Sequence, residues 1–177
     1  MDVARTLLGR SRDWTQGRHP QNASMSEAVG RSRMMPALPC LLGFVLGLAC
    51  NWVWPWPLGP YEYVLPAGAL LAVVVVVLVV NLLRAFSRHD TSPDPKEEST
   101  AIVDTGPFRF SRNPAYVAAG LLQAVLGLLF NNVWILLTII PAMIVIHYVV
   151  VIREEAYLEE KFGEAYLDYK SQVRRWI

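Results

Sequence analysis

Cysteine and histidine are scarce in this 177-residue chain, which has two of the first and three of the second. Cys40 and Cys50 fall in one apolar segment, where ten residues of helix would separate them by about 15 Å, too far for a disulfide. The chain has no Cys-x-x-Cys, and no histidine has a metal-binding spacing. The sequence therefore predicts neither a disulfide nor a redox or metal site.

Charge is sparse as well, because only 18% of the residues are charged and the net charge is +1. So small a net charge gives no reason to expect a nucleic-acid partner. Hydrophobic residues, by contrast, make up 54% of the chain, and the mean hydropathy is +0.32. This composition is too apolar for an ordinary soluble domain, and it predicts an all-α integral membrane protein with membrane lipids around it.

The apolar residues concentrate in four segments of near-bilayer length, at about 37–56, 64–83, 115–131 and 133–152. A tryptophan cluster near residue 54 resembles an interfacial belt, and Pro141 predicts a kink in the fourth segment. We expect four transmembrane helices followed by an amphipathic cytoplasmic helix. Residues 36–177 would then form a single membrane domain.

The first 35 residues are polar and Arg-rich, with six arginines against three acidic residues. Three interpretations are open: a disordered cytoplasmic tail, a transit-like peptide, or sequence upstream of a start at Met25, Met34 or Met35. The disordered tail is favoured.

The basic residues predict the orientation in the membrane. They occur in the N-terminal segment, between the second and third apolar segments, and after the fourth, whereas residues 57–63 and 131–132 contain no Lys or Arg. The positive-inside rule then places both termini in the cytoplasm, in a multi-pass protein.

Gly43 and Gly47 have the Gly-x-x-x-Gly spacing of a helix-packing face. Glycine is common in membrane helices, so the sequence favours an incidental pair over a packing motif.

A polar motif precedes the third segment, in the sequence Gly-Pro-Phe-Arg-Phe-Ser-Arg-Asn-Pro-Ala-Tyr of residues 106–116. Asn113 suits an N-cap and Pro114 the first helical position. The helix start, with Arg109 and Arg112, could hold a carboxylate or a phosphate. A plain positive-inside flank with a helix cap is an equally good interpretation.

A second polar motif, Arg153-Glu154-Glu155, follows the fourth segment. Carboxylates at this depth can accept hydrogen bonds from hydroxyls or an amino group, although a solvated helix extension is the more common case. Because the turn at residues 131–132 is short, two antiparallel helices would bring both motifs into one polar pocket.

Two polar residues lie inside apolar segments, His147 and Gln123. Without a visible partner, the structural interpretation leads for both, although His147 could line a channel. The tail from Tyr157 to Trp176 has helix-like aromatic spacing interrupted by Gly163, which favours packing on the bundle or at the interface.

Taken together, these motifs resemble the isoprenylcysteine carboxyl methyltransferase and phospholipid N-methyltransferase superfamily over about residues 91–177. The resemblance rests on residues 100–108, on Arg112-Asn-Pro-Ala-Tyr116, on Glu154-Glu155-x-x-Leu158, and on the tail from Phe162-Gly163 to Val173-x-Arg175. It implies S-adenosylmethionine as methyl donor, and the absence of Gly-x-Gly-x-x-Gly agrees with a site outside a Rossmann fold.

The resemblance also implies the site residues. The cofactor-binding positions are Thr100, Ala101, Ile102, Val103, Phe108, Arg112, Asn113, Pro114, Ala115, Tyr116 and Glu154. Apart from the resemblance, Arg153 and Glu155 beside Glu154 are candidates for binding the substrate. By charge, Arg112 suits the donor's carboxylate and Glu154 its amino group or ribose, while Tyr116 and Phe108 suit the sulfonium or adenine. The implied function is methyl transfer to a lipophilic or lipid-attached acceptor, through a carboxyl, thiol or amine, at the cytoplasmic face. No catalytic nucleophile is required, because the sulfonium already activates the methyl group.

The sequence departs from the prenylcysteine enzymes at three positions. It has Asn113 where they have His, Phe108 where they have Tyr, and Val150 where they carry a substrate-binding Arg. The prediction of the cofactor is therefore stronger than the prediction of a prenylcysteine acceptor. Two alternatives are open: a sterol-reductase-like NADPH-dependent reductase, which needs a larger bundle than four spans, and a non-catalytic membrane scaffold of the same fold.

Overall fold

The computed structural model describes residues 37–88 and 102–177. In this part of the chain every regular element is a helix, which confirms the all-α prediction. The predictions for residues 1–35, and those for Thr100 and Ala101, fall outside the described residues.

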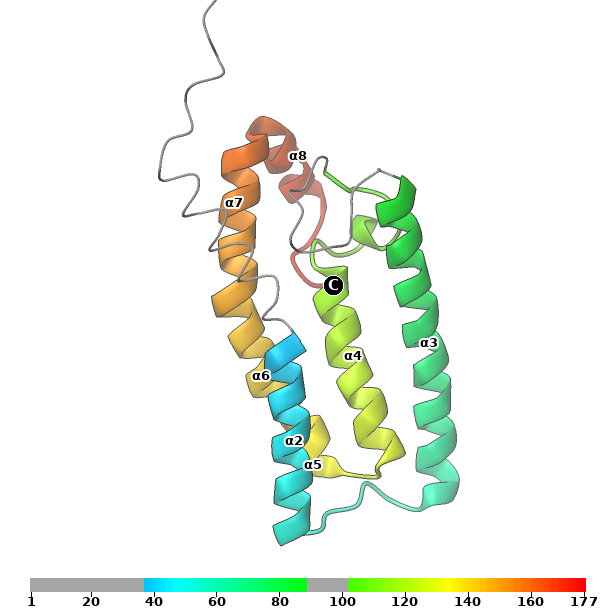
Figure 1. Ribbon diagram of the computed structural model, residues 1–177. Helices are drawn as coiled ribbons and strands as arrows, with labels where there is room; N and C mark the ends of the chain where they lie inside the picture. The colour runs from blue at the N-terminus through cyan, green and yellow to red at the C-terminus, as the bar shows by residue number, and fades with distance from the viewer. Residues whose placement is uncertain (1–36, 89–101) are drawn as a thin grey trace, which may run out of the picture.

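Four helical columns run side by side along the long axis of the molecule (Figure 1). They are α2 (Ala37–Val53), α3 (Tyr61–Arg88), α4 (Pro114–Leu129), and a column built of α5 (Val133–Leu137), α6 (Ile139–Val145), η2 (Ile146–Val151) and α7 (Ile152–Phe162). α4 lies between α3 on one side and α2 with α6 on the other. The short helices η1 (Gly106–Arg109) and α8 (Glu164–Gln172) lie at the end where α4 begins.

Two of these helical stretches are long and apolar enough to cross a membrane, Tyr61–Ser87 and Val133–Phe162. α2 and α4 are apolar but shorter, with 17 and 16 residues. Sixteen residues of helix extend about 24 Å, against about 30 Å of bilayer core. Four transmembrane spans therefore stay a prediction.

Four helix ends differ from the predicted span boundaries, each for a local reason. α2 ends at Val53 rather than at residue 56, because the residue before Pro55 disfavours helical geometry. α3 runs from Tyr61 to Arg88 rather than from 64 to 83, since hydropathy marks only the apolar part of a helix. The last column continues past residue 152 to Phe162 for the same reason.

The last column is irregular in the middle, as Pro141 predicted. α5 ends at Leu137, and Thr138 separates it from α6. Pro141 has no N–H to donate to the carbonyl of Leu137, four residues earlier, so the helical ladder is interrupted there. Beyond this point, Ile146–Val151 form a wider π-helical turn.

Two asparagines make the turn between α4 and α5. Asn131 adopts a positive φ of 49°, a conformation that asparagine tolerates better than most residues. The Asn132 side chain caps α5 by accepting hydrogen bonds from the backbone N–H groups of Trp134 and Ile135. The Asn131 side chain bonds to the backbone of Leu58 and Gly59, which joins this turn to the α2–α3 connection.

Gly43 and Gly47 lie where α2 crosses the last column. A Cβ on Gly47 would stand 2.7 Å from the Cα of Ile135, and one on Gly43 would stand 2.8 Å from Nε2 of Gln123. The prediction that this pair is incidental was wrong for Gly47, where glycine is needed because the backbones approach closely; at Gly43 the nearest atom is the end of a flexible side chain. Gln123 is structural, as expected, since its Nε2 donates to Thr138 Oγ1 at 3.1 Å and to the carbonyl of Ile135.

Candidate functional site

The loop between η1 and α4 places the first motif at one end of the bundle. Asn113 occupies the N-cap position of α4 and Pro114 begins the helix, as the sequence predicts. The Asn113 side chain makes no capping bond, however; it donates instead to the backbone carbonyl of Arg175 at 3.0 Å. Ser111 Oγ accepts from the Asn113 backbone N–H at 3.1 Å and donates to the same carbonyl. The loop is thus bonded to the C-terminal residues.

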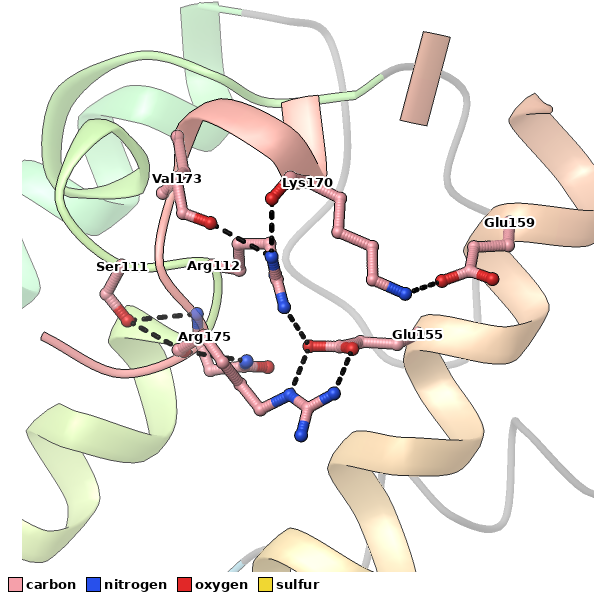
Figure 2. A network of polar contacts seen from close by, with 8 residues as sticks. Ser111, Arg112, Glu155, Glu159, Lys170, Val173 and Arg175 are labelled. Atoms are coloured by element: carbon pink, nitrogen blue, oxygen red, sulfur yellow. Dashed lines mark hydrogen bonds and ion pairs between the residues drawn. The ribbon is translucent and has the colours of Figure 1, made fainter. Parts of the chain in front are cut away.

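Arg112 and Arg175 approach the carboxylate of Glu155 from two sides (Figure 2). Nη2 of Arg112 donates to Oε1 at 3.1 Å, while Nε and Nη2 of Arg175 donate to Oε1 and Oε2, each at 2.9 Å. The side chains of Arg112 and Glu155 are only 8% and 6% exposed. We name Arg112, Glu155 and Arg175 the ion cluster.

The ion cluster holds the segment after α8 against the start of α4. Nη1 of Arg112 donates to the backbone carbonyls of Lys170 and Val173, both at 2.9 Å, and its backbone N–H donates to the carbonyl of Arg174. The chain therefore turns back toward α4 after α8 (Figure 1). Next to the cluster, Glu155 raises the pKa of Arg175, chiefly through its hydrogen bond, so this guanidinium is charged at every physiological pH.

Tyr116 and Glu154 meet directly beside this cluster. The Tyr116 hydroxyl, from the first turn of α4, donates to Oε2 of Glu154 at the start of α7, with 2.5 Å between the oxygens. Tyr116 is buried, with 9% of its surface exposed, and packs with Ile146, Val150 and Val151 in the apolar core. Two motifs separated by a helical hairpin in the sequence therefore meet in one place, as the antiparallel arrangement predicted.

The other cofactor-binding candidates lie around the start of α4 and beside α8, in different surroundings. Val103 is buried, and Ile102 lines a cleft beside α8. The Phe108 ring packs edge-on against Phe86 of α3, with 5.5 Å between ring centroids. Its carbonyl accepts a hydrogen bond from the Tyr169 hydroxyl. Pro114 is buried and Ala115 exposed at the start of α4.

The two substrate-binding candidates differ in their surroundings. Arg153 is exposed on α7. Glu155 is buried in the ion cluster, with both oxygens bonded to guanidinium groups, so its position is that of a structural anchor.

Sequence reasoning assigned no contact to Arg175, and it expected the tail only to pack on the bundle or at the interface. The tail contributes through backbone carbonyls, which leave no mark in a sequence. The signal that was available is the Val173-x-Arg175 pair in the family pattern. A cleft of about 560 Å³ beside α8, lined by Asp104, Arg109, Asp168 and Tyr169 among others, was also not anticipated. Burial and the nearby Asp104 raise the pKa of Tyr169 to about 12, while the charge of Arg112 opposes that rise.

Metal ligands do not gather anywhere in the described residues: no three His, Cys, Asp or Glu side chains there lie close enough to hold a metal ion.

Comparison with known proteins gives the class. The profile of a family described as phospholipid methyltransferase matches residues 63–165, more than half of the chain. The protein thus belongs to the phospholipid methyltransferase family, part of the isoprenylcysteine/phospholipid methyltransferase group of membrane proteins. A protein of Haemophilus influenzae described as uncharacterized is 49% identical over 41 residues, which cover 23% of this chain and 65% of that protein. The chain thus spans just under two thirds of that relative. No solved structure matches this chain significantly.

Proposed function

We propose that this protein transfers a methyl group from S-adenosylmethionine to a lipophilic acceptor at a membrane surface. The observation that carries the proposal is the meeting of Tyr116 and Glu154, from two separate motifs, in a member of a methyltransferase family. The Tyr116 hydroxyl and the Glu154 carboxylate lie between the apolar core and the ion cluster. A polar donor and an apolar acceptor can meet there.

The residues present fit the donor in a more limited way than charge alone suggested. Glu154 is suited to an ammonium group or to ribose hydroxyls, and Tyr116 orients its carboxylate. Arg112 bonds to Glu155 and to backbone carbonyls through Nη1 and Nη2, but its buried Nε has no hydrogen-bond partner within the part of the chain that the structure describes. That one N–H is the part of Arg112 available for an oxygen of the donor, because a buried donor is costly to leave unpaired.

The donor supplies an activated methyl group. The chain's own task is to position the donor and the acceptor and to exclude water. The ion cluster performs the positioning: it ties α7, the start of α4 and the tail into one unit, so that Tyr116 and Glu154 are presented together. The segment after α8 also covers this part of the core, since Trp176 packs against it.

The acceptor in this proposal arrives from the bilayer. In this proposal all four apolar columns cross it, and both termini are cytoplasmic, because Lys and Arg flank the apolar segments on one side and are absent from residues 57–63 and 131–132 on the other. Many apolar side chains on α3 are exposed, among them Leu70, Val73 and Val76, as lipid-facing residues are. Since the matching family is described as phospholipid methyltransferase, we favour a phospholipid amine as the acceptor over a carboxyl or a thiol group.

Calorimetric titration of S-adenosylmethionine into detergent-purified protein tests the proposal. Wild type should bind saturably, and Glu154→Gln should lose at least tenfold in affinity. Glu160→Gln, an exposed glutamate on the same helix, is the matched control and should bind like wild type.

Lack of binding by a folded wild-type sample would overturn the proposal. Saturable binding of NADPH instead would favour the reductase alternative, and binding of neither cofactor would favour a scaffold.

A further inference from the structure

His147 has a polar side chain in an apolar part of the bundle. The proposed donor site does not use this side chain. His147 lies in the π-helical turn η2, and its buried Nδ1 has no hydrogen-bond partner among residues 37–88 and 102–177. Buried polar atoms are nearly always hydrogen-bonded, so each exception calls for an explanation. An imidazole nitrogen that lacks a partner can bond to a ligand that displaces the side chains covering it.

The surroundings of His147 are aromatic and aliphatic. Its ring lies 6.0 Å from the Trp176 ring, at 42°, and 4.8 Å from the Tyr148 ring, measured between centroids. Trp176 in turn packs against the buried cluster of Tyr116, Ile146 and Val150. His147 therefore adjoins the same core on which the Tyr116–Glu154 pair rests.

The position along the helix suits an acceptor rather than the donor. Seven residues separate His147 from Glu154, which corresponds to about 10 Å of helix rise. Ile144 and Tyr148, on either side of it in the sequence, are 52% and 65% exposed, so this stretch of the column borders the surrounding medium. The π turn that contains His147 and ends at Val151 sets the rotation of His147 relative to Glu154, and such turns are frequent at functional sites.

We propose that His147 Nδ1 accepts a hydrogen bond from the N–H of a phospholipid amine and takes up the proton that this amine must lose. This inference rests on the proposed function and names the group that holds the acceptor. A new bond forms between the amine nitrogen and the methyl carbon of the sulfonium donor. The carbon–sulfur bond breaks with its electron pair left on sulfur, and the amine proton passes to His147. A carboxylate acceptor has no proton to give up and would gain nothing from this nitrogen.

The first experiment measures binding without catalysis. In ¹⁵N-histidine-labelled protein, the Nδ1 resonance of His147 is identified by its loss in His147→Asn, since the chain has only three histidines. Dioleoylphosphatidylethanolamine should shift this resonance, whereas dioleoylphosphatidylcholine, which has the same phosphate but no N–H, should leave it unchanged. Equal shifts with both lipids, or none with either, would overturn the inference.

The second experiment follows methyl incorporation into phosphatidylethanolamine. His147→Asn and His147→Ala should both lower kcat by about 10²- to 10⁴-fold, the range of general acid–base catalysis, with donor affinity within twofold of wild type. Tyr148→Phe, which keeps the neighbouring ring, should retain wild-type kcat. Because asparagine preserves polarity but accepts no proton, wild-type kcat in His147→Asn would refute the role.

The two proposals fail separately. Loss of donor binding would remove the methyltransferase function while a lipid-dependent shift at His147 would still establish an amine site. Normal donor binding with no lipid-dependent shift would refute only the inference about His147.

Discussion

Glu155→Gln is the substitution that tests the ion cluster most directly. It keeps the size of the side chain but removes the charge that two guanidinium groups share. Arg112, with a side chain 8% exposed, would then be left as a buried cation with a neutral partner. Breaking a buried pair from one side costs about 3–5 kcal/mol.

The expected shift in melting temperature follows from that free energy. For a chain of this size, each kcal/mol lowers Tm by about 2–4 °C, so the substitution should lower Tm by about 6–20 °C. The matched control is Glu159→Gln on the same helix, which removes an ion pair with Lys170 whose two side chains are both 35% exposed. Exposed pairs contribute about 0–1 kcal/mol, so the control should shift Tm by at most about 4 °C.

Thermal unfolding of the two variants in the same detergent, followed by near-ultraviolet circular dichroism, measures the difference. Glu155→Gln should also weaken donor binding, because the start of α4 and the tail lose their common anchor. Equal melting temperatures for Glu155→Gln and Glu159→Gln would refute the argument, since they would mean that Glu155 is as well solvated as Glu159.

Three further predictions concern packing, capping and pH. Gly47→Ala should destabilise the bundle by about 1–3 kcal/mol in chemical denaturation, because its Cβ would meet the backbone of Ile135; Gly59→Ala, with 3.8 Å to its nearest neighbour, should cost less than 0.5 kcal/mol, roughly the level of a surface change. Asn132→Ala should lower the free energy of unfolding by about 0.5–2 kcal/mol through loss of the α5 cap, and Asn132→Ser, which keeps an oxygen at the cap without burying a charge beside the Gly47 carbonyl, should retain part of it. The raised pKa of Tyr169 means that its contribution to stability is complete below pH 10 and is lost as the pH rises toward about 12. Wild-type protein should therefore lose stability across that window more steeply than Tyr169→Phe, and parallel alkaline unfolding curves would contradict the assigned burial.

The elements of the fold followed closely from local chemistry. Pro141, the Asn131-Asn132 pair and Pro114 each act on their own neighbours in the chain, so the interruption near residue 138, the tight turn and the start of α4 were all predictable. The errors lay at helix ends, because hydropathy follows the apolar residues and does not see that α3 and α7 continue helically through polar sequence.

The site was predictable only in part. The family pattern and the antiparallel hairpin brought Tyr116 and Glu154 together on paper, and the structure places them within hydrogen-bond distance. Arg112 and Glu155 were candidates for binding a ligand, whereas they bond mainly to each other, to Arg175 and to the tail. Charge at a position says what a residue is able to bind, and only the neighbours decide which partner it takes.

By itself, therefore, the sequence determined the helical class, the family, the turn between α4 and α5, and the pairing of two motifs across a hairpin. These depend on residues near one another in the chain or on a pattern in fixed order. Only the tertiary structure decided that Gly47 is needed at a helix crossing, that Arg112 serves the C-terminal tail, and that His147 has an unpartnered nitrogen. Each of these depends on backbone or side-chain atoms from a distant segment, whose distance and direction are fixed only when the helices pack.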